Sequence, residues 1–110
     1  MTLARCMAVM VVGALGLVTP CAADERQSAA LAEQLGGVIA AEEFCGLAYD
    51  QAAIAAFIEQ KVAADDMAFP KWLGVFTSSA GRDQERMSAS AKTAHCVQMR
   101  RIAIAYRFIR

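Results

Sequence analysis

The sequence predicts an all-α fold, a small bundle of about four helices stapled by one disulfide. Apolar residues recur at steps of three and four, the spacing of one helix face, and no segment alternates as a strand does. The length of 110 residues gives room for one domain. The cysteines that remain after a leader segment, Cys45 and Cys96, form a single pair.

Residues 1–23 are typical of a secretory signal peptide. Arg5 gives a short positive start, and an uncharged stretch follows from Cys6 to Val18. This stretch fits a signal-peptide core of about 7–15 residues, whereas a membrane span takes roughly 20. An uncleaved membrane anchor is the alternative, and the length of the apolar stretch argues against it.

Cleavage is expected before Asp24, because Cys21 and Ala23 place small residues at positions −3 and −1. A lipoprotein would need a small residue in front of Cys21, and Pro20 stands there instead. The mature chain is then a single helical domain, residues 24–110. We expect it to be periplasmic or secreted, with no integral membrane association after cleavage.

The cysteine pair predicts the disulfide. Cleavage leaves Cys45 and Cys96 as the only cysteines, and export brings them into an oxidising compartment. The bridge closes a loop of about 50 residues, which the chain-entropy model converts into roughly 4 kcal/mol of stability.

The first helix is expected from Asp24 to Cys45. Its apolar stripe is Leu31, Leu35, Val38, Ile39 and Cys45. Gly36 and Gly37 predict a bend or a close helix contact, because each costs roughly 1 kcal/mol relative to alanine. Gly46 is expected as the C-terminal glycine.

The second helix begins after Asp50, a good N-cap. Its apolar face is Ile54, Phe57, Ile58 and Val62. The third helix carries Phe69, Trp72, Leu73 and Phe76. Residues 77–81 are expected to end it, and residues 82–85 to form a polar loop. We expect Trp72 to be largely buried between helices, with Phe76 and Phe57.

The fourth helix is expected to start at Ser88 or Ser90 and to run towards Phe108. Its inner stripe is Cys96, Met99, Ile102, Ala103 and Tyr106. The disulfide would pin the end of the first helix to the last, and the second and third helices would close the bundle between them.

Charge is divided along the chain. Residues 24–66 carry nine acidic and two basic side chains, whereas residues 67–110 carry eight basic and two acidic ones. Packing of acidic helices beside basic ones is the ordinary interpretation, and a dipolar surface that steers a partner is the functional one. The formal net charge of zero argues against a nucleic-acid-binding protein.

Four arginines near the C-terminus form the candidate interaction surface: Arg100, Arg101, Arg107 and Arg110. Such a cluster suits an acidic protein partner, or weak contact with anionic lipid. The same arginines also suit the negative end of a helix dipole.

No catalytic, cofactor-binding or metal-ligating set of residues is expected. His95 is the only histidine, and its neighbour Cys96 is assigned to the disulfide. A zinc site needs three or four ligands of the His/Cys type. The acidic pairs at 42–43 and 65–66 lack the spacing of a calcium loop. We therefore expect no enzyme activity, no cofactor and a surface position for His95.

Several motifs resemble those of small exported proteins of alphaproteobacteria. They are FCGL at 44–47, YDQAAI at 49–54, MS at 87–88, AKTAHC at 91–96, RR at 100–101 and YRFI at 106–109. The resemblance covers roughly residues 42–109 and brings no assigned activity. Some such proteins carry the label "signal recognition particle", which this sequence does not support because it has no phosphate loop and no basic RNA surface.

These observations predict an exported, non-catalytic binding or interaction module whose partner the sequence does not name. The alternative is a periplasmic acid-stress chaperone, because the layout of one disulfide in a small helical chain is similar to that of acid-activated periplasmic chaperones. In acid the mature chain would lose up to eleven carboxylate charges and keep ten basic ones.

Overall fold

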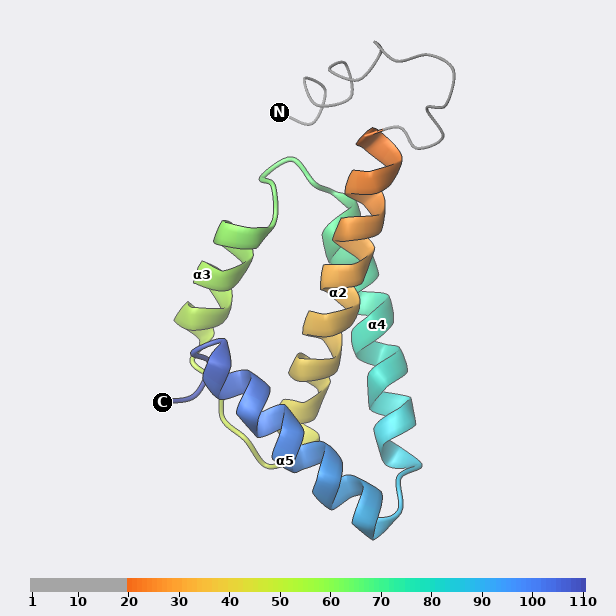
Figure 1. Ribbon diagram of the computed structural model, residues 1–110, viewed down its shortest axis with the longest axis vertical. Helices are drawn as coiled ribbons and strands as arrows, with labels where there is room; N and C mark the ends of the chain where they lie inside the picture. The colour runs from red at the N-terminus through yellow and green to blue at the C-terminus, as the bar shows by residue number, and fades with distance from the viewer. Residues whose placement is uncertain (1–19) are drawn as a thin grey trace.

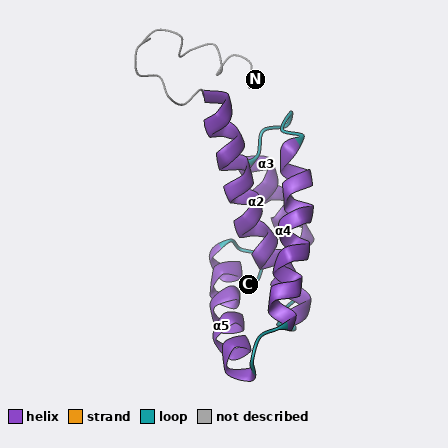
Figure 2. Cartoon of the chain, turned by 90° about the vertical axis from the view of Figure 1, so that its right-hand side faces the viewer, coloured by secondary structure: helices purple, strands orange, loops and turns teal. Residues whose placement is uncertain are grey.

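The computed structural model describes residues 20–110, with side chains from residue 25 onward. Most of the predicted signal peptide lies outside these residues. The described part contains four helices and no strand (Figures 1 and 2), which confirms the all-α prediction. The helices are α2 (Pro20–Phe44), α3 (Gln51–Lys61), α4 (Ala68–Glu85) and α5 (Ala89–Ala105). The expected helix start at Asp24 is wrong, because α2 begins at Pro20, a residue that the first helical turn tolerates.

The helices α2 and α4 lie side by side and form most of the core (Figures 1 and 2). The buried apolar residues of α2 are Ala32, Leu35, Val38 and Ala41. Phe69 of α4 packs into the same cluster. In Figure 1, α3 and α4 flank α2 on opposite sides and α5 crosses its lower end. The central helix of the bundle is therefore α2.

Gly36 allows the close approach of α2 and α4. A Cβ atom at Gly36 would lie 2.9 Å from the backbone nitrogen of Thr77 and 3.0 Å from Cβ of Phe76. A Cβ atom at Gly37 would meet nothing within 4 Å. The close contact predicted from the glycine pair is confirmed, and it depends on Gly36 alone.

We expect Gly36→Ala to lower the free energy of unfolding by about 1–3 kcal/mol, because the backbone of α4 must move to admit the methyl group. Gly37→Ala is the matched control on the same helix, and it should raise the stability by up to about 1 kcal/mol through helix propensity. Urea unfolding of both variants measures the difference. Equal stability of the two variants would contradict the close contact.

Local capping signals locate the ends of three helices as predicted. The Asp50 carboxylate accepts hydrogen bonds from the backbone N–H groups of Ala52 (3.0 Å) and Ala53 (3.4 Å). Ser88, and not Ser90, caps α5, because its hydroxyl accepts from the N–H of Ala91 at 3.2 Å. At the end of α2, Gly46 has a φ of +67°, the conformation expected of a C-terminal glycine.

The predicted end of the third helix is wrong. Residues 77–81 continue α4, and residues 82–85 are its last turn instead of a polar loop. Serine, threonine and glycine are weak helix formers, but tertiary packing overrides such propensities. The packing here is the close contact with α2, in which the backbone of Thr77 lies against Gly36.

The prediction that Trp72 is largely buried with Phe57 is also wrong. Trp72 is 37% exposed, and its ring stacks on Phe76 with centroids 5.9 Å apart. Phe57 instead contacts Tyr106 and Phe108. The reason is topological, since α3 and α4 lie on opposite sides of α2.

The predicted disulfide is confirmed. Cys45 follows the last residue of α2, and Cys96 lies inside α5, with an S–S distance of 2.05 Å and a Cα–Cα distance of 5.4 Å. The bridge joins the C-terminal end of α2 to the middle of α5.

Candidate functional site: a groove between α3 and α5

Four aromatic side chains hold α3 against the rest of the fold. This aromatic cluster consists of Tyr49, Phe57, Tyr106 and Phe108. The ring centroids of Phe57 and Tyr106 are 4.8 Å apart, and those of Phe57 and Phe108 are 5.6 Å apart, within the favourable range for aromatic pairs. No residue of α3 is fully buried, and the cluster positions this helix together with the partly buried Ile54 and Ile58, which also pack against the core.

Tyr49 fixes the cluster to α2. Its hydroxyl donates to the carbonyl oxygen of Val38 at 2.8 Å, and its backbone N–H donates to the Glu42 carboxylate at 2.7 Å. Burial, with a smaller contribution from the negative charge of Glu42, raises the pKa of Tyr49 to about 12. The phenol therefore stays protonated at neutral pH and keeps its hydrogen bond.

The chain reverses after α5 in a left-handed turn at Arg107, which has a φ of +66°. The N–H of Phe108 donates to the carbonyl of Ala103 at 2.8 Å, and the N–H of Arg107 donates to that of Ile104 at 2.9 Å. These two bonds form a Schellman motif. The carbonyl of Phe108 then accepts from the N–H of Asp50 at 2.8 Å, which places the C-terminal segment beside the start of α3 (Figure 1).

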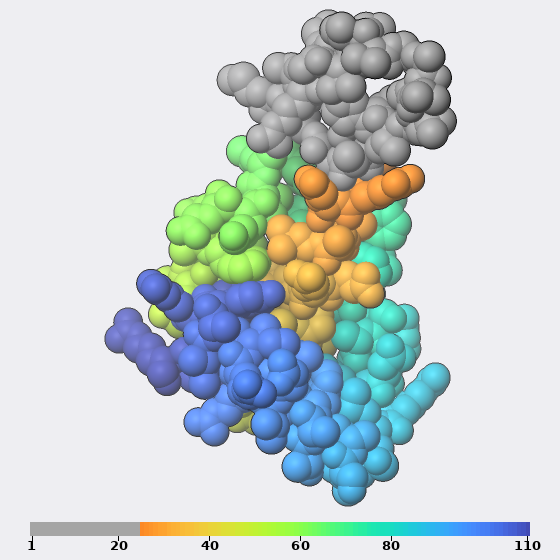
Figure 3. Space-filling view, in the orientation of Figure 1, coloured from red at the N-terminus to blue at the C-terminus, as the bar shows by residue number. Residues whose placement is uncertain are grey.

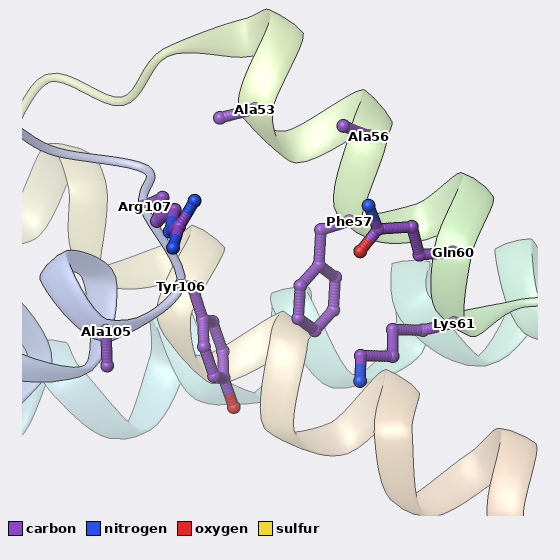
Figure 4. A pocket seen from close by; sticks show the side chains of 8 residues that line it. All are labelled: Ala53, Ala56, Phe57, Gln60, Lys61, Ala105, Tyr106 and Arg107. Atoms are coloured by element: carbon purple, nitrogen blue, oxygen red, sulfur yellow. The ribbon is translucent and has the colours of Figure 1, made fainter.

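An open groove of about 470 Å³ lies between α3 and the C-terminal end of α5. Phe57, Gln60 and Lys61 line it from α3, Tyr106 and Arg107 line it from the other side, and three alanines complete the walls. Figure 4 shows the rings of Phe57 and Tyr106 facing each other, with Arg107 and Lys61 at opposite ends of the ring pair. Figure 3 shows α3 and α5 meeting on one face of the molecule.

The groove carries two cations without counter-charges. Lys61 and Arg107 are both exposed, and neither forms an ion pair with a carboxylate of the described residues. The residues that line the groove include no carboxylate, histidine or thiol. The floor of the groove is apolar and a cation lies at each end, so the groove is suited to an anion that also carries an apolar group.

A second cavity of about 420 Å³ lies between α2 and α5. Its lining is mainly apolar, with Gly37, Val38, Met99 and Ile102, and the exposed residues Glu33 and Gln34 of α2 also line it. Tyr106 lines both this second cavity and the groove. The Tyr106 side chain therefore lies between the groove, which carries the cations, and the second cavity, which is mainly apolar.

Of the predicted arginine surface, only Arg107 lines the groove. Arg100, Arg101 and Arg110 are exposed and line neither the groove nor the second cavity. The guanidinium of Arg101 donates to the Gln98 side chain at 3.3 Å. The sequence analysis missed Lys61 and Gln60, and it assigned Tyr106 and Phe57 to the core. Only the topology, which places the C-terminus beside α3, identifies these residues.

His95 is half-buried instead of lying on the surface as expected. Its Nε2 atom is 3.1 Å from the side-chain nitrogen of Gln84, which is 2% exposed and needs a polar partner. The edge of the imidazole faces the ring of Phe44, with centroids 6.2 Å apart. Its neighbour Cys96 is in the disulfide. These contacts give His95 a structural task at the α4–α5 corner.

Among the described residues, no group of three His, Cys, Asp or Glu side chains is arranged to hold a metal ion. None of the described helices is long and apolar enough to cross a membrane. Comparison with protein-family models, with curated proteins and with solved structures gives no match. The resemblance to small exported alphaproteobacterial proteins therefore stays a prediction, and the function has to be argued from the groove.

The backbone of Arg107 gives a testable consequence. A left-handed conformation costs a non-glycine residue roughly 1–2 kcal/mol, and α2 ends in the same motif with Gly46 at the equivalent position. We expect Arg107→Gly to raise the free energy of unfolding by about 1 kcal/mol, whereas Arg107→Ala should leave it nearly unchanged. Thermal unfolding compares the two variants. A glycine variant no more stable than the alanine variant would show that the turn stores no strain.

Proposed function

We propose that the mature chain is a small exported binding module that holds an anionic ligand in the groove between α3 and α5 and does not transform it. The observation that carries this proposal is the placement of two cations, Lys61 and Arg107, at the two ends of the Phe57–Tyr106 ring pair, where neither forms an ion pair within the described residues. A carboxylate between these cations would gain charge-assisted hydrogen bonds, and the rings would bury its apolar part.

The strained turn supports the same interpretation. A glycine at position 107 would relieve the backbone, yet the sequence places an arginine there. Residues held in a strained backbone conformation are often found at functional sites. From this position the Arg107 side chain lines the groove.

Export and the absence of catalysis belong to the proposal as well. The disulfide supports export, because structural disulfides persist in oxidising compartments. The composition of the groove supports binding without chemistry. Its polar side chains supply cationic, amide and phenolic donors, whereas a general base is usually a histidine or a carboxylate.

A titration with benzoate tests the proposed site, with benzyl alcohol as the neutral ligand of similar shape. We expect benzoate to shift the backbone amide NMR signals of residues 53–61 and 105–108, and benzyl alcohol to bind at least tenfold more weakly. The double variant Lys61→Gln/Arg107→Gln should lower the benzoate affinity about tenfold or more.

The matched control is Arg100→Gln/Arg101→Gln, which removes the same two charges from α5 outside the groove. This variant should bind benzoate as the parent protein does. Equal losses in the two double variants would mean that net charge attracts the anion, and the groove would then not be its site.

A chaperone that binds unfolded clients is the second candidate. It is supported by large apolar side chains on and next to α4, namely Met67 (80% exposed), Trp72 and Val75. This candidate predicts suppression of client aggregation at low pH, weakened by Trp72→Ser/Val75→Ser. No protection of a client by the compact protein in acid would reject it.

A further inference from the structure

We infer that the ligand of the groove is a single-chain anionic amphiphile of the fatty-acid class, whose carboxylate lies between Lys61 and Arg107 and whose acyl chain passes Tyr106 into the second cavity. This inference rests on the proposed function and extends it to the class of ligand. It draws on the relation between the two cavities, which the proposal for the groove does not use.

The two cavities differ in chemistry in the way that the two parts of an amphiphile differ. The groove has cations at its ends. The second cavity has a mainly apolar lining that includes Val38, Met99 and Ile102, and its polar lining residues are the exposed Glu33 and Gln34. Their volumes of about 470 and about 420 Å³ are each within the range of small-molecule sites. A charged group in one cavity and a hydrocarbon chain in the other would satisfy both.

Tyr106 lines both cavities, as does Ala105, and no hydrogen bond within the described residues holds the Tyr106 hydroxyl in place. The hydroxyl of Tyr49 donates to a backbone carbonyl, but that of Tyr106 has no hydrogen-bond partner among the described residues. Apolar packing positions the Tyr106 side chain, which is partly buried against the core and has its ring centroid 4.8 Å from that of Phe57 and 5.5 Å from that of Phe108. A rotation of Tyr106 about its side-chain bonds would therefore connect the cavities without breaking a hydrogen bond within the described chain.

The binding of a free, monomeric chain fits this architecture better than contact with a bilayer. The second cavity lies between two helices of the fold, where it offers space to one chain at a time. The remaining arginines of the candidate surface lie outside both cavities. The carboxylate in the groove therefore belongs to a free fatty acid and not to a lipid of a bilayer.

The test measures the affinity for hexanoate, decanoate and tetradecanoate below their micellar concentrations by calorimetry with the oxidised protein. Each methylene that enters an apolar cavity should tighten binding about fourfold. We expect a steep rise in affinity from hexanoate to decanoate. Decanoate and tetradecanoate, but not hexanoate, should shift the NMR signals of Val38, Met99 and Ile102.

Gly37→Met is the variant that isolates the second cavity. Gly37 lines this cavity and has open space around its Cβ position, so a methionine there fills the cavity without entering the groove. The variant should bind hexanoate as the parent does and lose the gain on going to decanoate. Gly37→Ala adds a single methyl group and should lose only part of the gain. Circular dichroism and thermal unfolding confirm that both variants are folded.

The outcomes separate this inference from the proposed function. If benzoate and hexanoate bind but affinity does not rise with chain length, the ligand is not a long-chain amphiphile, whereas the anion site in the groove stands. No binding of any anion would overturn both. Equal decanoate affinity in Gly37→Met and the parent would overturn the path into the second cavity. Binding to anionic vesicles with no binding of monomeric decanoate would identify a membrane surface as the partner and overturn the inference.

Discussion

Phe108→Ala is expected to lower the free energy of unfolding by about 3–5 kcal/mol, the range for truncating a buried aromatic side chain. Phe108 is only 1% exposed although it lies close to the end of the chain. Its ring contacts Tyr49, Phe57 and Tyr106 and is thus shared by three segments. Loss of the ring leaves a cavity in the aromatic cluster that positions α3.

The matched control is Ile104→Ala, which removes a 47% exposed apolar side chain from α5 and should cost well under 1 kcal/mol. Chemical denaturation measures both variants, and hydrogen exchange shows where the damage lies. The amides of α3 should lose protection first in Phe108→Ala, because α3 has no fully buried residue of its own. A Phe108→Ala variant that melts like the parent would show that α3 is held by other contacts.

Local signals in the sequence sufficed for most helix boundaries. Asp50 and Ser88 act as N-caps because their side-chain oxygens satisfy free N–H groups at the start of a helix, and Gly46 ends α2 because glycine tolerates a positive φ. The disulfide followed from the cysteine count together with the expected export. These inferences need only neighbouring residues or a single pair.

The inferences that failed needed the topology. Nothing near Trp72 in the sequence shows that α3 lies across α2 from α4, so an aromatic stripe was assigned to the core although Trp72 is half-exposed. The early end predicted for the third helix failed for a related reason. Thr77 is a weak helix former, but its backbone lies against Gly36, and this packing supports the helix through to Glu85.

The candidate groove lay beyond sequence reasoning for the same physical reason. Its cations, Lys61 and Arg107, are 46 positions apart in the chain and line the same groove because the C-terminal segment runs beside α3, where the carbonyl of Phe108 accepts from the N–H of Asp50. The left-handed turn at Arg107 has no local signature, since arginine is not a residue that favours a positive φ. Only Arg107 was singled out beforehand, through its place in the C-terminal arginine cluster.

Removal of the disulfide by the double substitution Cys45→Ser/Cys96→Ser is expected to lower the free energy of unfolding by about 2–5 kcal/mol. The bridge spans 51 positions of the sequence and restricts the unfolded chain over more than half of residues 24–110. In the folded state it supplements the contact between α2 and α5, which is far smaller than that between α2 and α4. The double variant avoids the reactive thiol that a single substitution would leave.

The first half of α5 should be the part that loosens most when the bridge is removed. Its residues from Ala89 to Ala94 are exposed. Lys92 lies over the Phe44 ring, with its Nζ 4.5 Å from the ring centroid, and the first half-buried side chain of α5 is His95, beside Gln84. Hydrogen exchange should therefore rise at residues 89–97 before it rises in α2 or α4.

Val97→Ala, a change at an exposed position next to Cys96, is the control and should leave exchange unchanged. An unaltered unfolding midpoint in the double variant, or free Cys45 and Cys96 thiols in the native protein by mass spectrometry, would contradict this account. A free Cys96 thiol beside His95 would then bring a nucleophile back into consideration, and the proposal of binding without catalysis would have to be abandoned together with the disulfide.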